Sequence, residues 1–162
     1  MEDNNYTVPA NRPLSDAERV LIEWLLDNGI PEAKAYKRHL SDIHVSSTCS
    51  CGCPTIDLAT GNETERTTGP SQILADAEGL SPEGVPVNVI LHAREGELSE
   101  LEVFAIDGAS QFSLPLPEKL KIQYERKKPQ SGKGPCLAVP PHTTHHAGPQ
   151  WAVRRNHRAL AG

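Results

Sequence analysis

The sequence is poor in aromatic and hydrophobic side chains. Only 4% of its 162 residues are Phe, Trp or Tyr, and 37% are hydrophobic, a smaller apolar share than a globular domain usually has. The length suits one hydrophobic core, because two independent cores would leave each half too small. Part of the chain should therefore contribute nothing to packing. The apolar segments lie between Val20 and Leu116, where we expect the core.

The sequence also lacks a long hydrophobic run. No segment approaches the roughly 20 apolar residues that a membrane-spanning helix needs. Met1 is followed by Glu2, Asp3, Asn4 and Asn5, where a secretory leader would have basic and then apolar residues. We therefore expect a cytoplasmic protein with no membrane partner. In a reducing compartment, its four cysteines favour free thiols or metal ligands over disulfides.

Catalytic motifs are missing as well. The sequence has no glycine-rich phosphate loop, no Gly-x-Ser-x-Gly elbow and no helix that carries two histidines as in metalloproteases. His39, His44 and His92 could serve as bases for a nucleophilic cysteine, but none belongs to a hydrolase signature. These absences favour a protein that is not an enzyme.

Charge is distributed unevenly along the chain. Residues 1–118 contain 7 Lys or Arg against 20 Asp or Glu, whereas residues 119–162 contain 9 against 1. We expect a flexible N-terminal arm over residues 1–13, an α+β domain over residues 14–118, and a disordered basic Pro/His/Arg-rich tail over residues 119–162. The tail could bind nucleic acid, an anionic surface or its own acidic domain.

Two helices are predicted at the start of the domain. Ser15-Asp16-Ala17-Glu18 is a capping box, in which Ser15 and Glu18 each bond the backbone amide of the other. The apolar residues that follow recur at helical spacing, and Gly29 is expected to end the helix in the left-handed conformation. Pro31 suits the first turn of a second helix over residues 31–42. The two helices should form a hairpin.

Strands are predicted after the helices. Residues 45–58, 73–77, 85–94 and 98–106 are rich in β-branched residues or alternate between apolar and polar side chains. Glu95-Gly96 is a plausible hairpin turn between the last two. The expected fold is α+β, with an N-terminal helical hairpin packed on a three- to four-stranded antiparallel meander and a poorly ordered basic C-terminal tail.

Three segments together resemble a family of small uncharacterised bacterial proteins. The segments are Ser15-Asp16-Ala17-Glu18 with Trp24-Leu25-Leu26, Cys49-Ser50-Cys51-Gly52-Cys53-Pro54-Thr55-Ile56-Asp57-Leu58, and Gly96-Glu97-Leu98-Ser99-Glu100-Leu101-Glu102-Val103. The resemblance covers roughly residues 14–117, and the chain beyond Lys119 departs from it. The family has no established activity, so the resemblance implies an architecture and no function.

Cys49, Cys51 and Cys53 are the candidate metal ligands. On an extended strand their sulfurs would lie about 7 Å apart, which is too far for one tetrahedral ion, but a turn at Gly52 could gather them. A zinc site needs four ligands, and the fourth could be Cys136 or an imidazole such as His44. The alternatives are thiols that only pack in the domain, and cysteines with a redox or nucleophilic role.

The candidate sites of the tail have simpler explanations. The tail carries His142, His145 and His146, which resemble a metal patch only in composition. Its basic residues accompany no nucleic-acid-binding fold.

The favoured function is therefore a non-enzymatic cytosolic module that binds another macromolecule, a protein rather than a nucleic acid, through an acidic sheet surface. The alternative is a zinc-type thiolate site or a metal or redox sensor using Cys49, Cys51 and Cys53.

Overall fold

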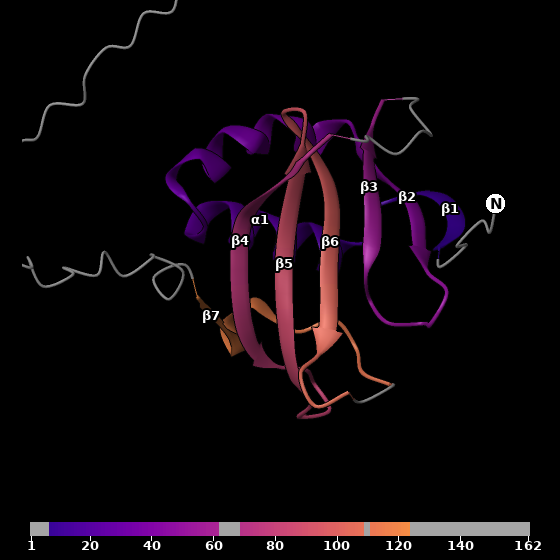
Figure 1. Ribbon diagram of the computed structural model, residues 1–162, viewed down its shortest axis with the longest axis vertical. Coiled ribbons are helices and arrows are strands. Elements are labelled where there is room, and N and C mark those ends of the chain that lie inside the picture. The colour runs from indigo at the N-terminus through magenta and orange to yellow at the C-terminus, as the bar shows by residue number, and fades with distance from the viewer. Residues whose placement is uncertain (1–6, 62–68, 109–110, 124–162) are drawn as a thin grey trace, which may run out of the picture. The chain divides into compact units, whose positions relative to one another are not determined.

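The computed structural model describes residues 7–61, 69–108 and 111–123 (Figure 1). Within them a seven-stranded antiparallel sheet has the strand order β1-β2-β3-β6-β5-β4-β7. The helices are α1 (Asp16–Asn28) and the 3-10 helices η1 (Pro31–Ser41) and η2 (Pro117–Lys119). The strands are β1 (Thr7–Pro13), β2 (Ile43–Cys49), β3 (Ile56–Thr60), β4 (Ser71–Leu80), β5 (Pro86–Arg94), β6 (Glu97–Ala105) and β7 (Leu120–Ile122).

The expected architecture of a helical hairpin on a three- to four-stranded meander is wrong. The sheet of the described residues has seven strands, and the second helical segment is a 3-10 helix. Part of the expected flexible arm is strand β1, which pairs with β2. Its two prolines are tolerated because an edge strand needs only one row of backbone hydrogen bonds. An α+β class is still compatible with these elements.

The short strand β7 lies within the segment expected to be a disordered tail. It pairs with the end of β4, with Gly79 opposite Leu120. Leu120 is buried in the core, which explains why this segment is held against the sheet. The remainder of the expected tail, from residue 124 onward, lies outside the described residues.

Helix α1 begins as the sequence predicts. The Glu18 amide donates to the Ser15 hydroxyl at 3.3 Å, and the Ser15 amide donates to the Glu18 carboxylate at 2.8 Å. The helix ends differently, because Gly29 has φ −75° and is not left-handed. A Cβ at this position would lie 2.2 Å from the Leu74 carbonyl oxygen in β4. Glycine is therefore needed here so that the helix end can approach the sheet closely.

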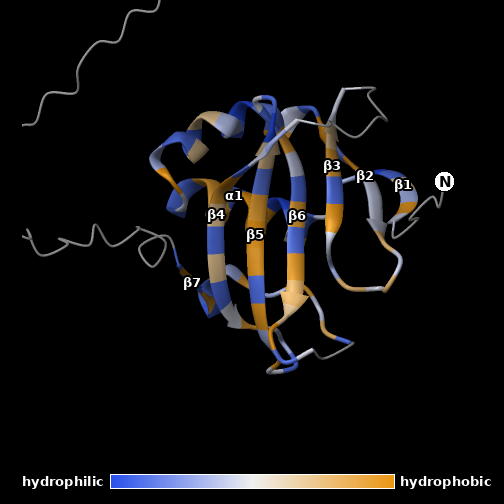
Figure 2. Cartoon of the chain, in the orientation of Figure 1, coloured by the Kyte–Doolittle hydropathy of each residue, from blue (hydrophilic) through white to orange (hydrophobic). Residues whose placement is uncertain are grey.

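The β4-β5-β6 meander carries the alternation that the sequence shows. Along β5, Val87, Val89 and Leu91 are fully buried, whereas the residues between them are half-buried. Glu95-Gly96 makes the predicted hairpin turn, since Arg94 pairs with Glu97. Figure 2 shows apolar and polar residues following one another along these strands.

In the described part of the chain, helices cover only one face of the sheet (Figure 1). In Figure 1, α1 passes behind β4, β5 and β6, and its buried leucines pack with the inward residues of these strands in one core. The opposite face carries polar side chains such as His92 and Glu102, together with Phe104, which is 41% exposed. The described residues place no helix on that face. They also contain no helix long and apolar enough to cross a membrane.

The sheet has two parts, one formed by β1, β2 and β3 and the other by β6, β5, β4 and β7. The two parts meet at a narrow junction between β3 and β6. Only Ile56 with Leu101 and Asp57 with Glu100 are paired across it, whereas β4 and β5 pair along their whole length. The hairpin of β2 and β3, on one side of this junction, carries the three cysteines of residues 49–53.

Candidate metal centre

The three cysteines lie on the loop between β2 and β3, which we call the cysteine loop (residues 49–55). The expected continuous strand over residues 45–58 is interrupted here, because β2 ends at Cys49 and β3 begins at Ile56. The Cys49 amide donates to the Thr55 carbonyl and the Gly52 amide to the Cys49 carbonyl, both at 3.2 Å. Gly52 has φ 83°, a left-handed conformation that glycine adopts without strain. The alternating cysteines therefore mark a closed turn.

This turn brings the three sulfurs together. The Sγ atoms of Cys49 and Cys51 are 2.9 Å apart, and the Sγ atoms of Cys49, Cys51 and Cys53 all lie within 4.8 Å of one another. Thiolates bound to one zinc ion at 2.3 Å are separated by about 3.8 Å. Small side-chain rotations would therefore suffice for all three sulfurs to bind the same ion.

Hydrogen bonds within the loop distinguish the cysteines. The Cys53 amide donates to the Cys51 sulfur at 3.4 Å. Donation from the Cys49 thiol and from the Cys53 backbone lowers the pKa of Cys51. The same Cys49–Cys51 hydrogen bond, together with burial, raises the pKa of Cys49 to about 11.

The structure does not bring His44, one of the two proposed fourth ligands, to the cluster. No histidine or carboxylate of the described residues joins the three sulfurs. His44 lies at the start of β2 and Cys49 at its end, a separation of about 16 Å at the usual rise per residue. Cys136 lies outside the described residues. Among the described residues, the cluster thus offers three ligands, all of them sulfur.

The surroundings of the loop are partly polar. Cys53, Pro54 and Thr55 line a cavity of about 230 Å³, which Arg12 and Glu18 also reach. Arg12 and Glu18 form a two-pronged ion pair at 2.7 and 2.8 Å. This pair links β1 to the start of α1 beside the loop, and no local sequence pattern predicts it.

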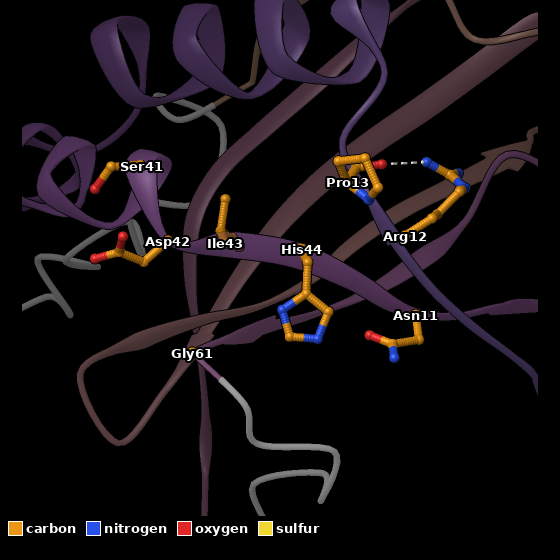
Figure 3. A pocket seen from close by; sticks show the side chains of 8 residues that line it. All are labelled: Asn11, Arg12, Pro13, Ser41, Asp42, Ile43, His44 and Gly61. Carbon is orange, nitrogen blue, oxygen red and sulfur yellow. Dashed lines mark hydrogen bonds between the residues drawn. The ribbon is translucent and has the colours of Figure 1, made fainter.

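A larger cavity, of about 410 Å³, surrounds His44 (Figure 3). The imidazole of His44 and the amide of Asn11 lie on the same side of the strand, but the Arg12 guanidinium turns away toward the Pro13 carbonyl. The Asp42 carboxylate also points away from the imidazole. These groups do not converge on a common point, so the cavity is a weaker candidate for a metal or ligand site than the cysteine loop.

The other two candidate bases are held elsewhere. His92 contacts the Glu102 carboxylate at 3.0 Å and the Ser71 hydroxyl at 2.9 Å. His39 accepts a hydrogen bond from the Arg38 side chain at 3.1 Å. The link between His92 and Glu102 was missed, although strand alternation places both residues on the polar face of β5 and β6.

Comparisons of the chain with protein-family models, with curated proteins and with solved structures find no match. The resemblance to a small bacterial family stays a prediction.

Proposed function

We propose that the protein binds a single thiophilic metal ion, such as Zn²⁺ or Cu⁺, through Cys49, Cys51 and Cys53. The observation that carries the proposal is the convergence of three sulfurs within 4.8 Å. Thiolates are soft ligands that favour Zn²⁺ and Cu⁺ over hard cations such as Mg²⁺ or Ca²⁺. A three-cysteine set therefore fits this class of ion.

The loop is suited to binding because little of it has to move. Its backbone is closed by two hydrogen bonds, and its ends continue into paired strands. The ion would replace the protons of the thiols, so binding should strengthen as the pH rises. Zn²⁺ would need one further ligand, from water, Cys136 or another molecule.

Metal titration of the full chain tests the proposal. We expect about one equivalent of Zn²⁺ or Cu⁺ to bind under anaerobic reducing conditions, and each change of Cys49, Cys51 or Cys53 to Ser to weaken binding at least about tenfold. Ser50→Ala is the matched control within the loop and should bind normally. Cys136→Ser tests the remaining fourth-ligand candidate. Equal binding by the triple Ser variant would refute the proposal.

A second candidate function is protein interaction through the sheet face that α1 does not cover, which we call the open face. Glu100 and Glu102 of β6 lie on it, with the exposed ring of Phe104 nearby. Charge complementarity favours a Lys/Arg-rich partner protein, and the interaction should weaken with salt.

The test of this candidate is binding of a Lys/Arg-rich peptide to the full chain at low and high salt. We expect Glu100→Gln with Glu102→Gln to weaken binding several-fold. Glu32→Gln is the control, because Glu32 is an exposed acid of η1 on the helical side. If both variants lose the same affinity, the peptide responds only to net charge and the open face is not the site.

A further inference from the structure

The three sulfurs differ in how accessible they are. Cys51 is exposed, whereas Cys49 and Cys53 are half-buried. Cys49 is the last residue of β2 and lies opposite Thr7 of β1. Cys53 lines the small cavity beside Pro54 and Thr55. An ion held by the three sulfurs would thus have two ligands set against the protein and one at the exposed turn.

The ligand set also leaves the ion incompletely enclosed. Structural zinc sites are closed by four protein ligands, and sites that exchange ligands keep one position open. Within the described residues, the cluster supplies three ligands and no His, Asp or Glu completes it. An ion at the exposed turn would therefore be reachable by a ligand from outside.

We propose that the cysteine loop is a transfer site, which passes its ion to an incoming thiol by ligand exchange with Cys51 as the first ligand to leave. This inference rests on the proposed metal binding. In the step, the sulfur of the incoming thiolate forms a bond to the ion and the bond from the Cys51 sulfur breaks. Cys51 then takes up the proton that the incoming thiol has lost. The ion keeps its oxidation state throughout.

Two features favour Cys51 as the leaving ligand. It is the exposed member of the cluster, and the Cys53 amide that donates to its sulfur would stabilise the negative charge that develops on this sulfur while its bond to the ion breaks, before the proton is taken up. The other two sulfurs would still hold the ion while the new bond forms. The acceptor should be a protein or peptide with two nearby cysteines, because its second thiol then attacks within the same complex.

The first measurement is the rate at which Cu⁺ leaves the loaded full chain. A Cys-x-x-Cys peptide is added over a range of concentrations under anaerobic conditions, and glutathione at equal thiol concentration is the comparison. We expect the rate to increase linearly with peptide, and the peptide to be at least about tenfold faster than glutathione. A rate independent of acceptor concentration would show that the ion dissociates first, which overturns the proposal. Equal rates for the two thiols would overturn the paired-cysteine acceptor.

The second measurement identifies the leaving ligand. Loaded Cys136→Ser protein is treated with a small amount of acceptor and then briefly with iodoacetamide, and the labelled cysteine is located by mass spectrometry. We expect label on Cys51 first, and protection of all three cysteines when acceptor is omitted. Label appearing first on Cys49 or Cys53 would contradict the assignment.

The two proposals fail in different ways. If the protein binds no metal, the cysteines of the metal-treated sample are alkylated without acceptor, and both proposals are lost. If metal binds and protects the cysteines but leaves at a fixed rate, the binding proposal stands and the transfer proposal is wrong.

Discussion

Glu18 connects two elements through one carboxylate. It accepts hydrogen bonds from the Ser15 amide at 2.8 Å and from both terminal nitrogens of Arg12 at 2.7 and 2.8 Å. Arg12 belongs to β1, so the edge strand is tied to the first turn of α1. Burial by itself raises the pKa of Glu18, but the hydrogen bonds from Arg12 and Ser15 outweigh it, and the pKa is lowered.

Replacing Glu18 should therefore destabilise the protein in a pH-dependent manner. We expect Glu18→Gln to lower the free energy of unfolding by about 1–3 kcal/mol at pH 7, because Arg12 and Ser15 lose a charged acceptor. A lowered pKa in the folded state adds stability above the unfolded pKa of about 4.3, and that stability is lost as the pH falls through the folded value. The difference between wild type and variant, measured by urea unfolding, should shrink below about pH 4.

Asp27→Asn is the control for this prediction. Asp27 and Lys37 also form an ion pair at 2.7 Å, but their side chains are 49% and 42% exposed. Exposed pairs of this kind contribute little, so the change should stay within about 0.5 kcal/mol. A Glu18→Gln effect that is equally small, or constant with pH, would show that Arg12 and Glu18 do not stabilise the fold.

At the scale of the element, the cysteine loop depends on the conformation of Gly52. A Cβ at Gly52 would meet no atom within 4 Å, so Gly52→Ala changes only the backbone preference, at a cost of about 1–2 kcal/mol. We expect the turn to open and metal binding to weaken by roughly tenfold, since 1.4 kcal/mol corresponds to that factor. Competition with a chromophoric chelator measures the change.

Gly96→Ala is the matched control for the loop. Gly96 also has a positive φ, 84°, and open space at its Cβ, but it lies in the β5–β6 turn at the other end of the sheet (Figure 1). It should lose similar stability and keep its metal affinity. If both variants bind equally well, the turn at Gly52 does not position the sulfurs.

Strand β1 can be tested by shortening the chain. Removing residues 1–13 deletes β1 and the partner of Glu18, and leaves the outer edge of β2 unpaired. We expect the free energy of unfolding, measured by urea unfolding, to fall by about 1–3 kcal/mol or more. We also expect self-association through the exposed edge, measured by sedimentation. Removing residues 1–6 keeps β1 and should have neither effect. Unchanged stability of the shorter chain would instead support the flexible arm predicted from the sequence.

The sequence predicts the elements whose signals are local. The capping box of Ser15 and Glu18 marks the start of α1, and alternation with the turn at Glu95-Gly96 defines the β5–β6 hairpin. Strands β1 and β7 were missed because they are short or contain proline, and their pairing depends on distant partners. The three candidate ligands were identified by their spacing. Their convergence was left open, because a turn and a strand can carry the same alternation.

For the whole molecule, metal binding and folding should be coupled. An ion that binds only the folded loop stabilises the protein, by about 2.7 kcal/mol when the free ion is at 100 times its dissociation constant. Each kcal/mol raises the melting temperature by roughly 2–8 °C in chains of this size range. We expect Zn²⁺ to raise it in the wild type and the effect to shrink at acidic pH, where protons compete for the thiols.

Thermal unfolding with and without Zn²⁺ measures this coupling. The triple variant with Cys49→Ser, Cys51→Ser and Cys53→Ser should show no increase in melting temperature with Zn²⁺. Ser50→Ala should show the same increase as the wild type. The same increase in the triple Ser variant would place the stabilising ion elsewhere in the molecule.

The strand order also determines when, during synthesis, the hairpin of the cysteine loop can pair with its neighbouring strand β6. The loop and its hairpin precede β6 by a long stretch of sequence, yet Ile56 of β3 pairs with Leu101 of β6. During synthesis the three thiols therefore leave the ribosome well before the strand that supports their hairpin is made. The nascent chain can thus meet metal ions and oxidants before it can complete its sheet. If the cysteine loop binds a metal ion as proposed, the metal supply during translation, and not only the folded structure, would affect which ion the protein takes up.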